Sequence, residues 1–428
     1  MIRFGTDGIR GRYGDEPCTE RVALRVGAAA VRLAGGQPVV IGRDTRPSGP
    51  ALQAAVAAGV LGAGGVPLLA GVVPTSAVAT AVAARIGGAG VMLTASHNAA
   101  PDNGFKLFAP GGHKLSDAQT AQVEAWLQEP AEPGVGDAVD IGDQVLNTYL
   151  SALLAAAGDL SALAGRTLVV DLAHGAASPL APRLAGLGGA TWRFIGAGDG
   201  VINDGVGSQH PAALQAAVVA AQADAGLAVD GDADRCVLVD QTGALVPGDT
   251  LAWWLCSARD VGGMAVTVMS TSALEAALPA VRVVRTPVGD RHLAMAMASQ
   301  GLALGCEESG HVLFDDGLVA GDGLLTGLRA LAAAFVRPAP LSATLSGFSP
   351  WPRHLSAMTV AERRPLEGEP RLSSLVARAE DLLGPGGRIF LRYSGTEPVL
   401  RVLVEGADAA SVATTAAQVR ALAQQVLG

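Results

Sequence analysis

Cysteine is scarce in this chain. Four cysteines occur among 428 residues, far apart and with no C-x-x-C pair. We therefore expect no disulfide framework, and the spacing is typical of reduced thiols in the core of a cytoplasmic protein. The first residues include Arg3, Asp7, Arg10 and Arg12 and contain no apolar stretch of the kind found in secretory signals, so we also expect no signal peptide.

Charge is sparse as well. Asp, Glu, Lys and Arg together make up 16% of the residues, whereas hydrophobic residues make up 50%. A chain of this length and composition buries several cores easily. The formal net charge of −9 argues against a partner bound through a nucleic-acid backbone. It does not exclude an anionic small molecule, because a local basic pocket can override the net sign.

Long uninterrupted hydrophobic runs are also missing. The range 47–84 carries no charge, but prolines and glycines interrupt it. A membrane-spanning helix needs an unbroken run of about 20 apolar residues. We therefore predict a helix, a strand, a loop and a second helix in this range, and no membrane partner.

The length predicts more than one domain, because a domain usually has roughly 100–200 residues. Short apolar runs followed by small and polar residues recur at Gly90–Leu93, Leu168–Asp171 and Ala265–Thr271, which is typical of repeated βα units. We predict three similar α/β domains and a smaller C-terminal α+β domain, with a proline-rich linker at Arg337–Pro352. The expected domains are residues 1–142, 143–241, 242–345 and 350–428.

One serine stands where an open α/β sheet would place its ligand. The apolar run Gly90–Leu93 predicts a buried strand, and Ser96 follows it in a turn of small and polar residues. Nearby, His97, Asn98 and Lys106 supply hydrogen bonds and charge suited to phosphate. An ordinary Ser-Asn turn is the alternative for this segment taken alone.

An arginine-rich stretch, Arg43–Gly49, follows a second predicted strand, Val39–Gly42. Its arginines could contact phosphate. We interpret it instead as a solvated loop that leads into the next helix.

Three aspartates crowd one predicted loop. Asp230, Asp232 and Asp234 occupy alternate positions directly after an apolar run. Like charges this close repel one another unless a cation balances them, and Mg²⁺ prefers oxygen ligands of this kind. An EF-hand is excluded, because its loop needs glycine and glutamate where this chain has Arg235 and Gln241. A solvated acidic turn is the remaining alternative.

Two further loops carry polar groups suited to a phosphorylated sugar. The first, Glu307–His311, follows an apolar run and offers carboxylates, a hydroxyl and an imidazole. The second, Arg392–Pro398, lies between two predicted strands and combines an arginine, two hydroxyls and a glycine, a composition suited to a backbone nest for phosphate. A plain turn is the alternative in each case.

Taken together and in this order, the motifs resemble those of the α-D-phosphohexomutases, which move phosphate between C1 and C6 of a hexose. The resemblance includes Phe4–Gly11 and Val288–Arg291, which are similar to the motifs of family members that act on glucosamine phosphates. It covers nearly the whole chain. It implies domains arranged around a central cleft and an isomerase that interconverts glucosamine 6-phosphate and glucosamine 1-phosphate.

The resemblance also implies roles for individual residues. Ser96 would carry a phosphoryl group, pass it to the sugar to form a bisphosphate, and take back the other phosphate. Asp230, Asp232 and Asp234 would bind Mg²⁺ together with an oxygen of the phosphorylated serine. The residues expected to assist catalysis are Arg10, His97 and Lys106. The residues expected to bind the phosphosugar substrate are Arg235, Glu307, Ser309, His311, Arg392, Ser394, Gly395 and Thr396.

Three positions depart from the family's pattern. Ala99 replaces a proline after the serine motif, which loosens the loop but removes no chemical group. Ala233 stands where the family commonly has glycine, a change that matters only if the backbone there has a positive φ. Glu308 replaces an amide within the sugar loop. Because neighbouring side chains alternate in direction, we expect its carboxylate to point to solvent, the alternative being a hydrogen bond from the C2 ammonium of the sugar.

Other functions remain open at this point. A phosphoglucomutase or phosphomannomutase would use the same machinery on another hexose. A secreted metal-dependent phosphatase with a serine nucleophile would need a leader and several zinc-binding histidines, and this chain has seven histidines in all. A non-catalytic sugar-phosphate binding module would have lost the serine or the acids, which are present. The sequence leaves the oligomeric state open, with a homodimer among the choices.

Overall fold

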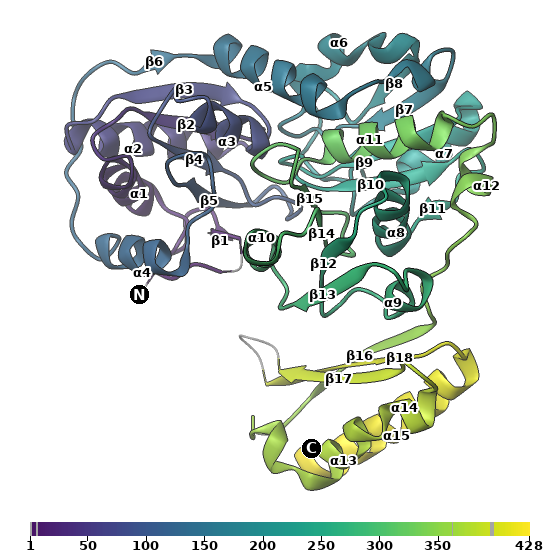
Figure 1. Ribbon diagram of the computed structural model, residues 1–428. Coiled ribbons are helices and arrows are strands. Elements are labelled where there is room, and N and C mark those ends of the chain that lie inside the picture. Colours follow the sequence, from purple (N-terminus) through teal and green to yellow (C-terminus); the bar gives the residue numbers. More distant parts are fainter. Residues whose placement is uncertain (1, 6, 362, 394–397) are drawn as a thin grey trace. The chain divides into compact units, whose positions relative to one another are not determined.

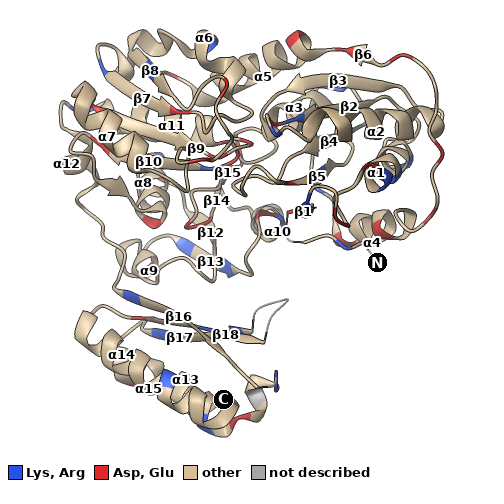
Figure 2. Cartoon of the chain, turned by 180° about the vertical axis from the view of Figure 1, so that it is seen from behind, with Lys and Arg blue, Asp and Glu red and all other residues tan. Residues whose placement is uncertain are grey.

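The computed structural model of the chain describes residues 2–5, 7–361, 363–393 and 398–428 (Figure 1). The chain divides into two compact units. The first unit comprises Met1–Met269 and Val284–Ser346, and the second comprises Ser270–Val283 and Gly347–Gly428. Most of the ribbon carries neither kind of charge, in keeping with the composition (Figure 2). No helix in the described ranges is both long and apolar enough to cross a membrane.

The first sheet is built from the N-terminal part of the first unit. Its strands are β1 (Ile9–Arg12), β2 (Val39–Arg43), β3 (Pro67–Val72), β4 (Ala89–Leu93), β5 (Asp102–Phe108) and β6 (Val139–Asp140), in the order β1-β5-β4-β2-β3-β6. Its helices are α1 (Glu20–Leu33), α2 (Gly49–Gly62), α3 (Thr75–Ala83) and α4 (Asp117–Trp126). Strands β2, β3 and β4 are parallel, and β5 returns antiparallel to β4. This return places Lys106 opposite Met92, next to the end of β4.

Helices α1 and α2 pack closely on one another, because glycine stands at their contact. A Cβ on Gly59 would lie 1.9 Å from the carbonyl oxygen of Leu24, and one on Gly27 would lie 2.1 Å from that of Val56. The apolar side chains of this layer form one buried core with those of the sheet. That core fixes the end of β4, where Ser96 follows.

The second sheet follows along the chain, with β7 (Thr167–Asp171), β8 (Thr191–Ile195), β9 (Ala225–Val229), β10 (Cys236–Asp240) and β11 (Leu245–Val246), in the order β11-β10-β9-β7-β8. The helices of this region are α5 (Gly142–Ala157), α6 (Ala181–Leu184) and α7 (Ala212–Ala221). Strand β10 returns antiparallel to β9, and the three aspartates lie on the loop that joins them. Because β11 pairs with β10, the second sheet extends to Val246.

The third sheet has the order β13-β12-β14-β15 and contains β12 (Gly263–Thr267), β13 (Arg282–Thr286), β14 (Leu304–Cys306) and β15 (Val312–Phe314). The helices of this region are α8 (Gly248–Arg259), α9 (Ala273–Ala277), α10 (Asp290–Gln300), α11 (Gly323–Phe335) and α12 (Leu341–Leu345). Strand β14 runs parallel to β12 and antiparallel to β15. The predicted sugar loop joins β14 to β15.

The C-terminal part of the second unit is an antiparallel sheet covered by helices. Its strands are β16 (Arg353–Thr359), β17 (Arg388–Tyr393) and β18 (Val399–Glu405), in the order β16-β18-β17. Helices α13 (Pro370–Ala377), α14 (Ala379–Leu383) and α15 (Ala409–Leu427) lie on one face of this sheet (Figure 1). A separate buried cluster of apolar side chains fills the space between them.

Several sequence predictions about local structure are confirmed. The uncharged range 47–84 forms α2, β3 and α3, and the four cysteines are buried and unpaired. The mixed α/β sheets also agree with the predicted fold class. The range Arg337–Pro352, predicted to be a linker, contains the short helix α12. Leu341 and Leu345 are buried there, and α12 packs on α11.

Candidate active site

Ser96 lies three residues beyond the end of β4, in a strained turn. Its φ is +52°, in the left-handed region that non-glycine residues rarely adopt, and its side chain is fully buried. The hydroxyl donates a hydrogen bond to Oδ2 of Asp230 at 2.6 Å. Its oxygen also lies 3.3 Å from Nδ1 of His97. The turn therefore directs the serine hydroxyl at the aspartate loop.

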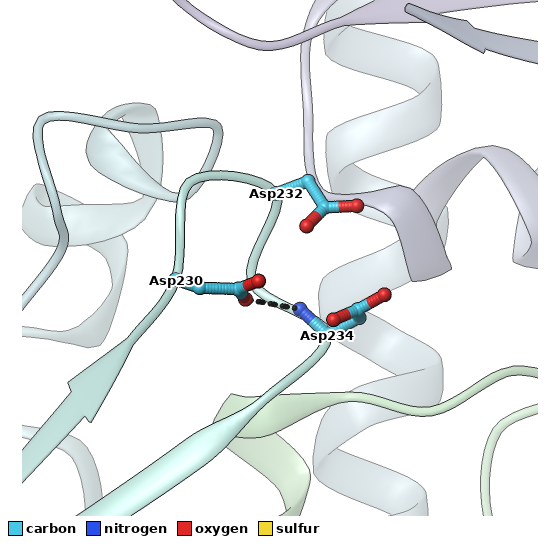
Figure 3. A group of neighbouring side chains, drawn as sticks. All are labelled: Asp230, Asp232 and Asp234. Carbon is cyan, nitrogen blue, oxygen red and sulfur yellow. Dashed lines mark hydrogen bonds between the residues drawn. The ribbon is translucent and has the colours of Figure 1, made fainter. Parts of the chain in front are cut away.

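The three aspartates of the β9–β10 loop form a compact cluster (Figure 3). One carboxylate oxygen from each of Asp230, Asp232 and Asp234 lies within 4.8 Å of the others, and all three side chains are buried. Among the described residues, Oδ1 of Asp232 and Oδ1 of Asp234 have no hydrogen-bond partner. Buried carboxylate oxygens without partners are costly. A hard divalent cation would satisfy them, so this donor set fits a metal ion.

Neighbouring charges give these carboxyl groups different proton affinities. Burial, together with the charges of Asp234 and Asp232, raises the pKa of Asp230 to about 7. Burial also acts to raise the pKa of Asp234, but Lys106, His311 and Arg235 lower it well below its usual value. The cluster therefore depends on nearby cations for its charge balance.

Lys106 supplies much of that balance. Its Nζ lies 2.7 Å from Oδ2 of Asp232, 2.7 Å from Oδ2 of Asp234 and 2.8 Å from Oδ2 of Asp7. Burial alone would lower the pKa of this ammonium, but the three carboxylates raise it well above its ordinary value. Lys106 is therefore a buried side chain held by three carboxylates that favour its charged form.

A cavity of about 340 Å³ opens beside these groups. The predicted site residues that line it are Arg10, His97, Asp234, Arg235, Glu307 and His311. These six come from distant parts of the sequence, and the structure brings them together within the first unit. Ser309 is not among the lining residues, although its hydroxyl donates to Oε2 of Glu307 at 3.2 Å.

The two histidines of the cavity differ in charge. Burial and the nearby Arg235 and Arg10 lower the pKa of His97 to about 4, so its imidazole is neutral at pH 7. Burial would also lower the pKa of His311, but Asp234, Asp290 and Glu307 raise it to about 9. The ring nitrogens of His311 lie 3.6 Å from Oδ1 of Asp234 and 3.4 Å from Oδ2 of Asp290, which are ion-pair distances.

Glu307 is oriented by its neighbours. Its Oε1 accepts a hydrogen bond from the backbone N–H of Gly289 at 3.0 Å, so the Val288–Arg291 motif meets the sugar loop directly. The prediction that Glu308 points to solvent is wrong in part. Its side chain is half-buried, and its Oε2 accepts a hydrogen bond from the hydroxyl of Thr267 at 3.2 Å. Because β12 ends at Thr267 beside β14, this hydroxyl is within reach of the loop.

The departure at Ala233 has a structural consequence. Its φ is +63°, so the backbone there is left-handed. A non-glycine residue in this conformation costs roughly 1–2 kcal/mol. The loop of the three aspartates therefore contains strain that a glycine would relieve.

Sequence reasoning did not single out three charged residues that form ion pairs beside the site, Asp7, Lys114 and Asp290. Asp7 contacts Arg10 and Lys106 at 2.8 Å each and also contacts Lys114. Lys114 in turn contacts Asp290, at the start of α10. Asp7 lies within the Phe4–Gly11 motif, which was its only signal in the sequence. Lys114 follows two glycines and a histidine, a pattern that predicts nothing specific.

The interpretation of Arg43–Gly49 as a solvated loop is wrong. Asp44 and Arg46 are both fully buried, and Nε of Arg46 donates to Oδ2 of Asp44 at 2.9 Å. The other guanidinium N–H groups donate to backbone carbonyls of the segment Ser96–Asp102, which we call the serine loop. A buried arginine is tolerated here because its charge is paired and its donors are satisfied.

The predicted phosphate loop of the second unit is only partly described. Arg392 lies on β17, opposite Arg401 on β18. The predictions for Ser394, Gly395 and Thr396 fall outside the described residues.

Sequence comparisons identify the family. Residues 1–133 match the profile described as phosphoglucomutase/phosphomannomutase, alpha/beta/alpha domain I, residues 248–350 match domain III, and residues 355–422 match the C-terminal domain. A phosphoglucosamine mutase of Frankia alni is 44% identical to this chain, over 99% of this chain and 98% of the relative. Another, of Rhodospirillum rubrum, is 41% identical over 96% and 95%.

Solved structures share the fold. A phosphoglucomutase/phosphomannomutase family protein from Burkholderia thailandensis is 25% identical, with a TM-score of 0.78 over 100% of this chain and 99% of that one. An N-acetylphosphoglucosamine mutase of Aspergillus fumigatus, solved in complex with GlcNAc-6P and magnesium, is 19% identical, with a TM-score of 0.65 over 98% and 95%. With near full-length relatives above 40% identity, the chain belongs to the phosphoglucosamine mutases of the phosphoglucomutase/phosphomannomutase family.

Proposed function

We propose that the chain interconverts glucosamine 6-phosphate and glucosamine 1-phosphate through a phosphorylated Ser96. The observation that carries the proposal is the hydroxyl of Ser96, held 2.6 Å from Asp230 at a cluster of buried carboxylates and cations. A phosphoryl group adds a charge of about −2, which only a cation and basic groups can hold at such a place. Lys106, Arg10 and Arg235 supply the basic groups.

The transfer conserves atoms and protons. The bond between Oγ of Ser96 and phosphorus breaks while a hydroxyl oxygen of the sugar forms a new bond to phosphorus. The sugar hydroxyl gives up its proton, and Oγ regains one. We assign this proton movement to His97, whose Nδ1 lies 3.3 Å from Oγ of Ser96, and to Arg10, which lines the cavity together with His97. The reverse transfer from the other end of the bisphosphate restores the phosphoserine.

The aspartate cluster is the proposed Mg²⁺ site. Asp230, Asp232 and Asp234 would hold the ion, with an oxygen of the phosphorylated Ser96 as a further ligand. When bound, Mg²⁺ neutralises charge on the phosphoryl group in transfer. Oδ1 of Asp232, which has no hydrogen-bond partner among the described residues, supports this assignment.

Substrate contacts are proposed for two loops. Glu307, which lines the cavity, and Ser309, which donates a hydrogen bond to it, would bind sugar hydroxyls. His311 and Arg235 would face phosphate from the cavity wall. In the second unit, Arg392 would bind the phosphate that is not reacting. Ser394, Gly395 and Thr396 are proposed to act with it.

We also propose that the chain has four domains. The presence of four sheets in chain order supports a division into domains 1–142, 143–241, 242–345 and 350–428, although the second sheet extends to Val246. Limited proteolysis with mass mapping tests it, and cleavage should concentrate near the expected boundaries.

A comparison of substrates tests the function. We expect kcat/KM for glucosamine 6-phosphate to exceed the values for glucose 6-phosphate and mannose 6-phosphate. A preference for either of the other sugars would assign the same machinery to a different hexose. Ser96→Ala should lose at least about a thousandfold in kcat, as nucleophile removal does in other enzymes. Ser161→Ala, an exposed serine outside the cavity, is the matched control.

The metal proposal has its own test, with a readout that does not depend on turnover. Titration calorimetry of chelator-treated protein should detect Mg²⁺ binding, and Asp232→Asn should weaken it because a negative ligand is lost. Unchanged Mg²⁺ affinity in Asp232→Asn would refute the assigned ligand set.

A further inference from the structure

Four backbone carbonyls of the serine loop converge on one side chain. Terminal nitrogens of Arg46 donate to the carbonyl oxygens of Ser96 at 2.9 Å, Asn98 at 2.8 Å, Ala99 at 2.5 Å and Asp102 at 2.7 Å. Such convergence requires a closed loop, because the chain must curl around the guanidinium to present these oxygens inward. The loop between β4 and β5 is therefore wrapped on Arg46.

All the N–H groups of the Arg46 guanidinium are engaged in hydrogen bonds in this arrangement. A guanidinium has five N–H groups in a fixed plane. Four go to the loop carbonyls, and the fifth, on Nε, goes to Oδ2 of Asp44 at 2.9 Å. The same carboxylate oxygen accepts from the hydroxyl of Thr94 at 2.7 Å, and Oγ1 of Thr94 accepts from the backbone N–H of Ser96 at 2.8 Å. None of these donors remains for a phosphate, which argues against a role for Arg46 in direct substrate contact.

A second side chain reaches the same carbonyls from another sheet. Asn203, on the loop between β8 and α7, donates through Nδ2 to the carbonyl oxygen of Ser96 at 2.8 Å and to that of Asn98 at 3.0 Å. It is buried, and its own φ of +60° is one that asparagine tolerates. The serine loop is thus held from the first sheet by Arg46 and from the second sheet by Asn203.

The loop of the three aspartates, Asp230–Asp234, lies against the same carbonyl of Ser96 and the same amide of Asn203. A Cβ on Gly231 would lie 2.6 Å from the carbonyl oxygen of Ser96 and 2.9 Å from Nδ2 of Asn203. Glycine at this position therefore allows the aspartate loop to approach the serine backbone. The approach places Asp230 within hydrogen-bond distance of the serine hydroxyl.

We infer that Arg46 and Asn203 are positioning residues that hold Ser96 in its left-handed conformation with the hydroxyl aimed at Asp230. The described residues that line the cavity include neither Arg46 nor Asn203. Both side chains therefore act through the backbone of the loop rather than on the sugar. The left-handed turn at Ser96 is unfavourable by itself and persists only where its surroundings over-determine it. We call the hydrogen bonds of Arg46 and Asn203 to the serine loop the clamp. Only the expected effect on kcat rests on the proposed function, because the clamp itself can be measured without substrate.

Two pairs of variants separate positioning from general stability. Arg46→Lys keeps the charge beside Asp44 but offers three donors without the planar fork. Its matched control is Arg43→Lys in the same segment, where the guanidinium makes one bond of 3.2 Å to the carbonyl oxygen of Asp44. Asn203→Asp keeps the size and the backbone preference but turns a donor into an acceptor facing two carbonyls. Its control is Asp204→Asn, at the adjacent exposed position.

The kinetic readout is the division of the effect between kcat and KM. A misplacement of about 1 Å at a reacting group costs about 100-fold in rate. We expect Arg46→Lys to lower kcat by about this factor and Asn203→Asp by about tenfold, with KM within about threefold of the parent. Both controls should match the parent. A rise in KM with unchanged kcat would overturn the inference, because it would place these side chains in substrate binding.

Hydrogen exchange provides the measurement without substrate. The backbone amides of Ser96, Asn98 and Asp102 donate to Thr94 Oγ1, Ala95 O and Ala99 O within the loop. These amides should exchange at least about tenfold faster in Arg46→Lys and Asn203→Asp than in the controls, while the rest of the chain is unchanged. Unchanged exchange in both variants would refute the clamp. If the parent isomerises no hexose phosphate, the proposed function fails while the exchange result still decides the clamp. If Arg46→Lys does not fold, Asn203→Asp carries the test.

Discussion

Thr75 provides a sharp test of the metal site, because its hydroxyl supports a proposed ligand without being one. It is the first residue of α3, and Oγ1 donates to Oδ2 of Asp232 at 2.5 Å. Its backbone N–H donates to the carbonyl oxygen of Asp232 at 3.0 Å. Both residues are buried. Thr75→Val keeps the shape and the backbone contact and removes only the side-chain donor.

The expected magnitude follows from this contact. A hydrogen bond to a charged group contributes about 1.5–3 kcal/mol, and loss of a partner that orients a metal ligand typically costs about 10–100-fold in affinity. We therefore expect the Kd for Mg²⁺ to rise by about 10–100-fold in Thr75→Val. The variant should fold normally, because no cavity is created and the threonine shape is retained.

Thr80→Val is the matched control for this prediction. Thr80 lies on the same helix and is also buried, but its hydroxyl has no hydrogen-bond partner in the described part of the chain. Titration calorimetry with Mg²⁺ on the chelator-treated parent and both variants gives the comparison. An unchanged Kd in Thr75→Val, or equal losses in both variants, would refute the reasoning that the hydroxyl orients Asp232.

The remaining predictions concern stability, substrate choice and substrate affinity. Tyr149→Phe should lower the free energy of unfolding in urea by about 1.5–3 kcal/mol, because its hydroxyl donates at 2.7 Å to the buried carboxylate of Asp322. Tyr13→Phe should change the free energy of unfolding by less than about 0.5 kcal/mol, because the hydroxyl of Tyr13 bonds to Glu20 in a solvent-exposed contact. Equal effects in the two variants would contradict the assignment. Glu308→Gln should leave the ratio of kcat/KM for glucosamine over glucose phosphate nearly unchanged, since its carboxylate contacts Thr267, and a tenfold fall would show that it reads the amine. Arg392→Ala should raise KM by roughly tenfold or more if the arginine holds the distal phosphate, and a normal KM on every phosphosugar would count against that role.

Local chemistry explains which parts of the site were predictable from the sequence. The apolar run before Ser96 and the alternating aspartates on a strand-to-strand loop are patterns of adjacent residues. Each pattern restricts its own segment strongly, and in the structure the hydroxyl of Ser96 donates a hydrogen bond to Asp230. The helix, strand and helix of the uncharged range 47–84 were predictable for the same reason, because glycine and proline mark the ends of elements locally.

The unpredicted parts depend on contacts between distant segments. Arg46 resembles any arginine of a polar loop in the sequence, and its burial becomes intelligible only when four carbonyls of another loop surround it. Asn203 has the pattern of an ordinary turn, yet it reaches the serine loop 105–107 residues away in the sequence. Glu308 was expected in solvent from alternation alone, and Thr267 from a neighbouring strand supplied its partner. Sequence spacing carries no signal for such pairs.

The most direct test of the central claim follows the phosphate on Ser96 through a single turnover. Active protein carrying phosphate on this residue is mixed with glucosamine 6-phosphate and quenched at short times, and intact mass and peptide mapping report the phosphorylated fraction. The account predicts that phosphate leaves Ser96 as a glucosamine bisphosphate appears, and returns as glucosamine 1-phosphate is released. Repeated turnover with the phosphate on Ser96 unchanged, or by protein without phosphate there and without added bisphosphate, would contradict it.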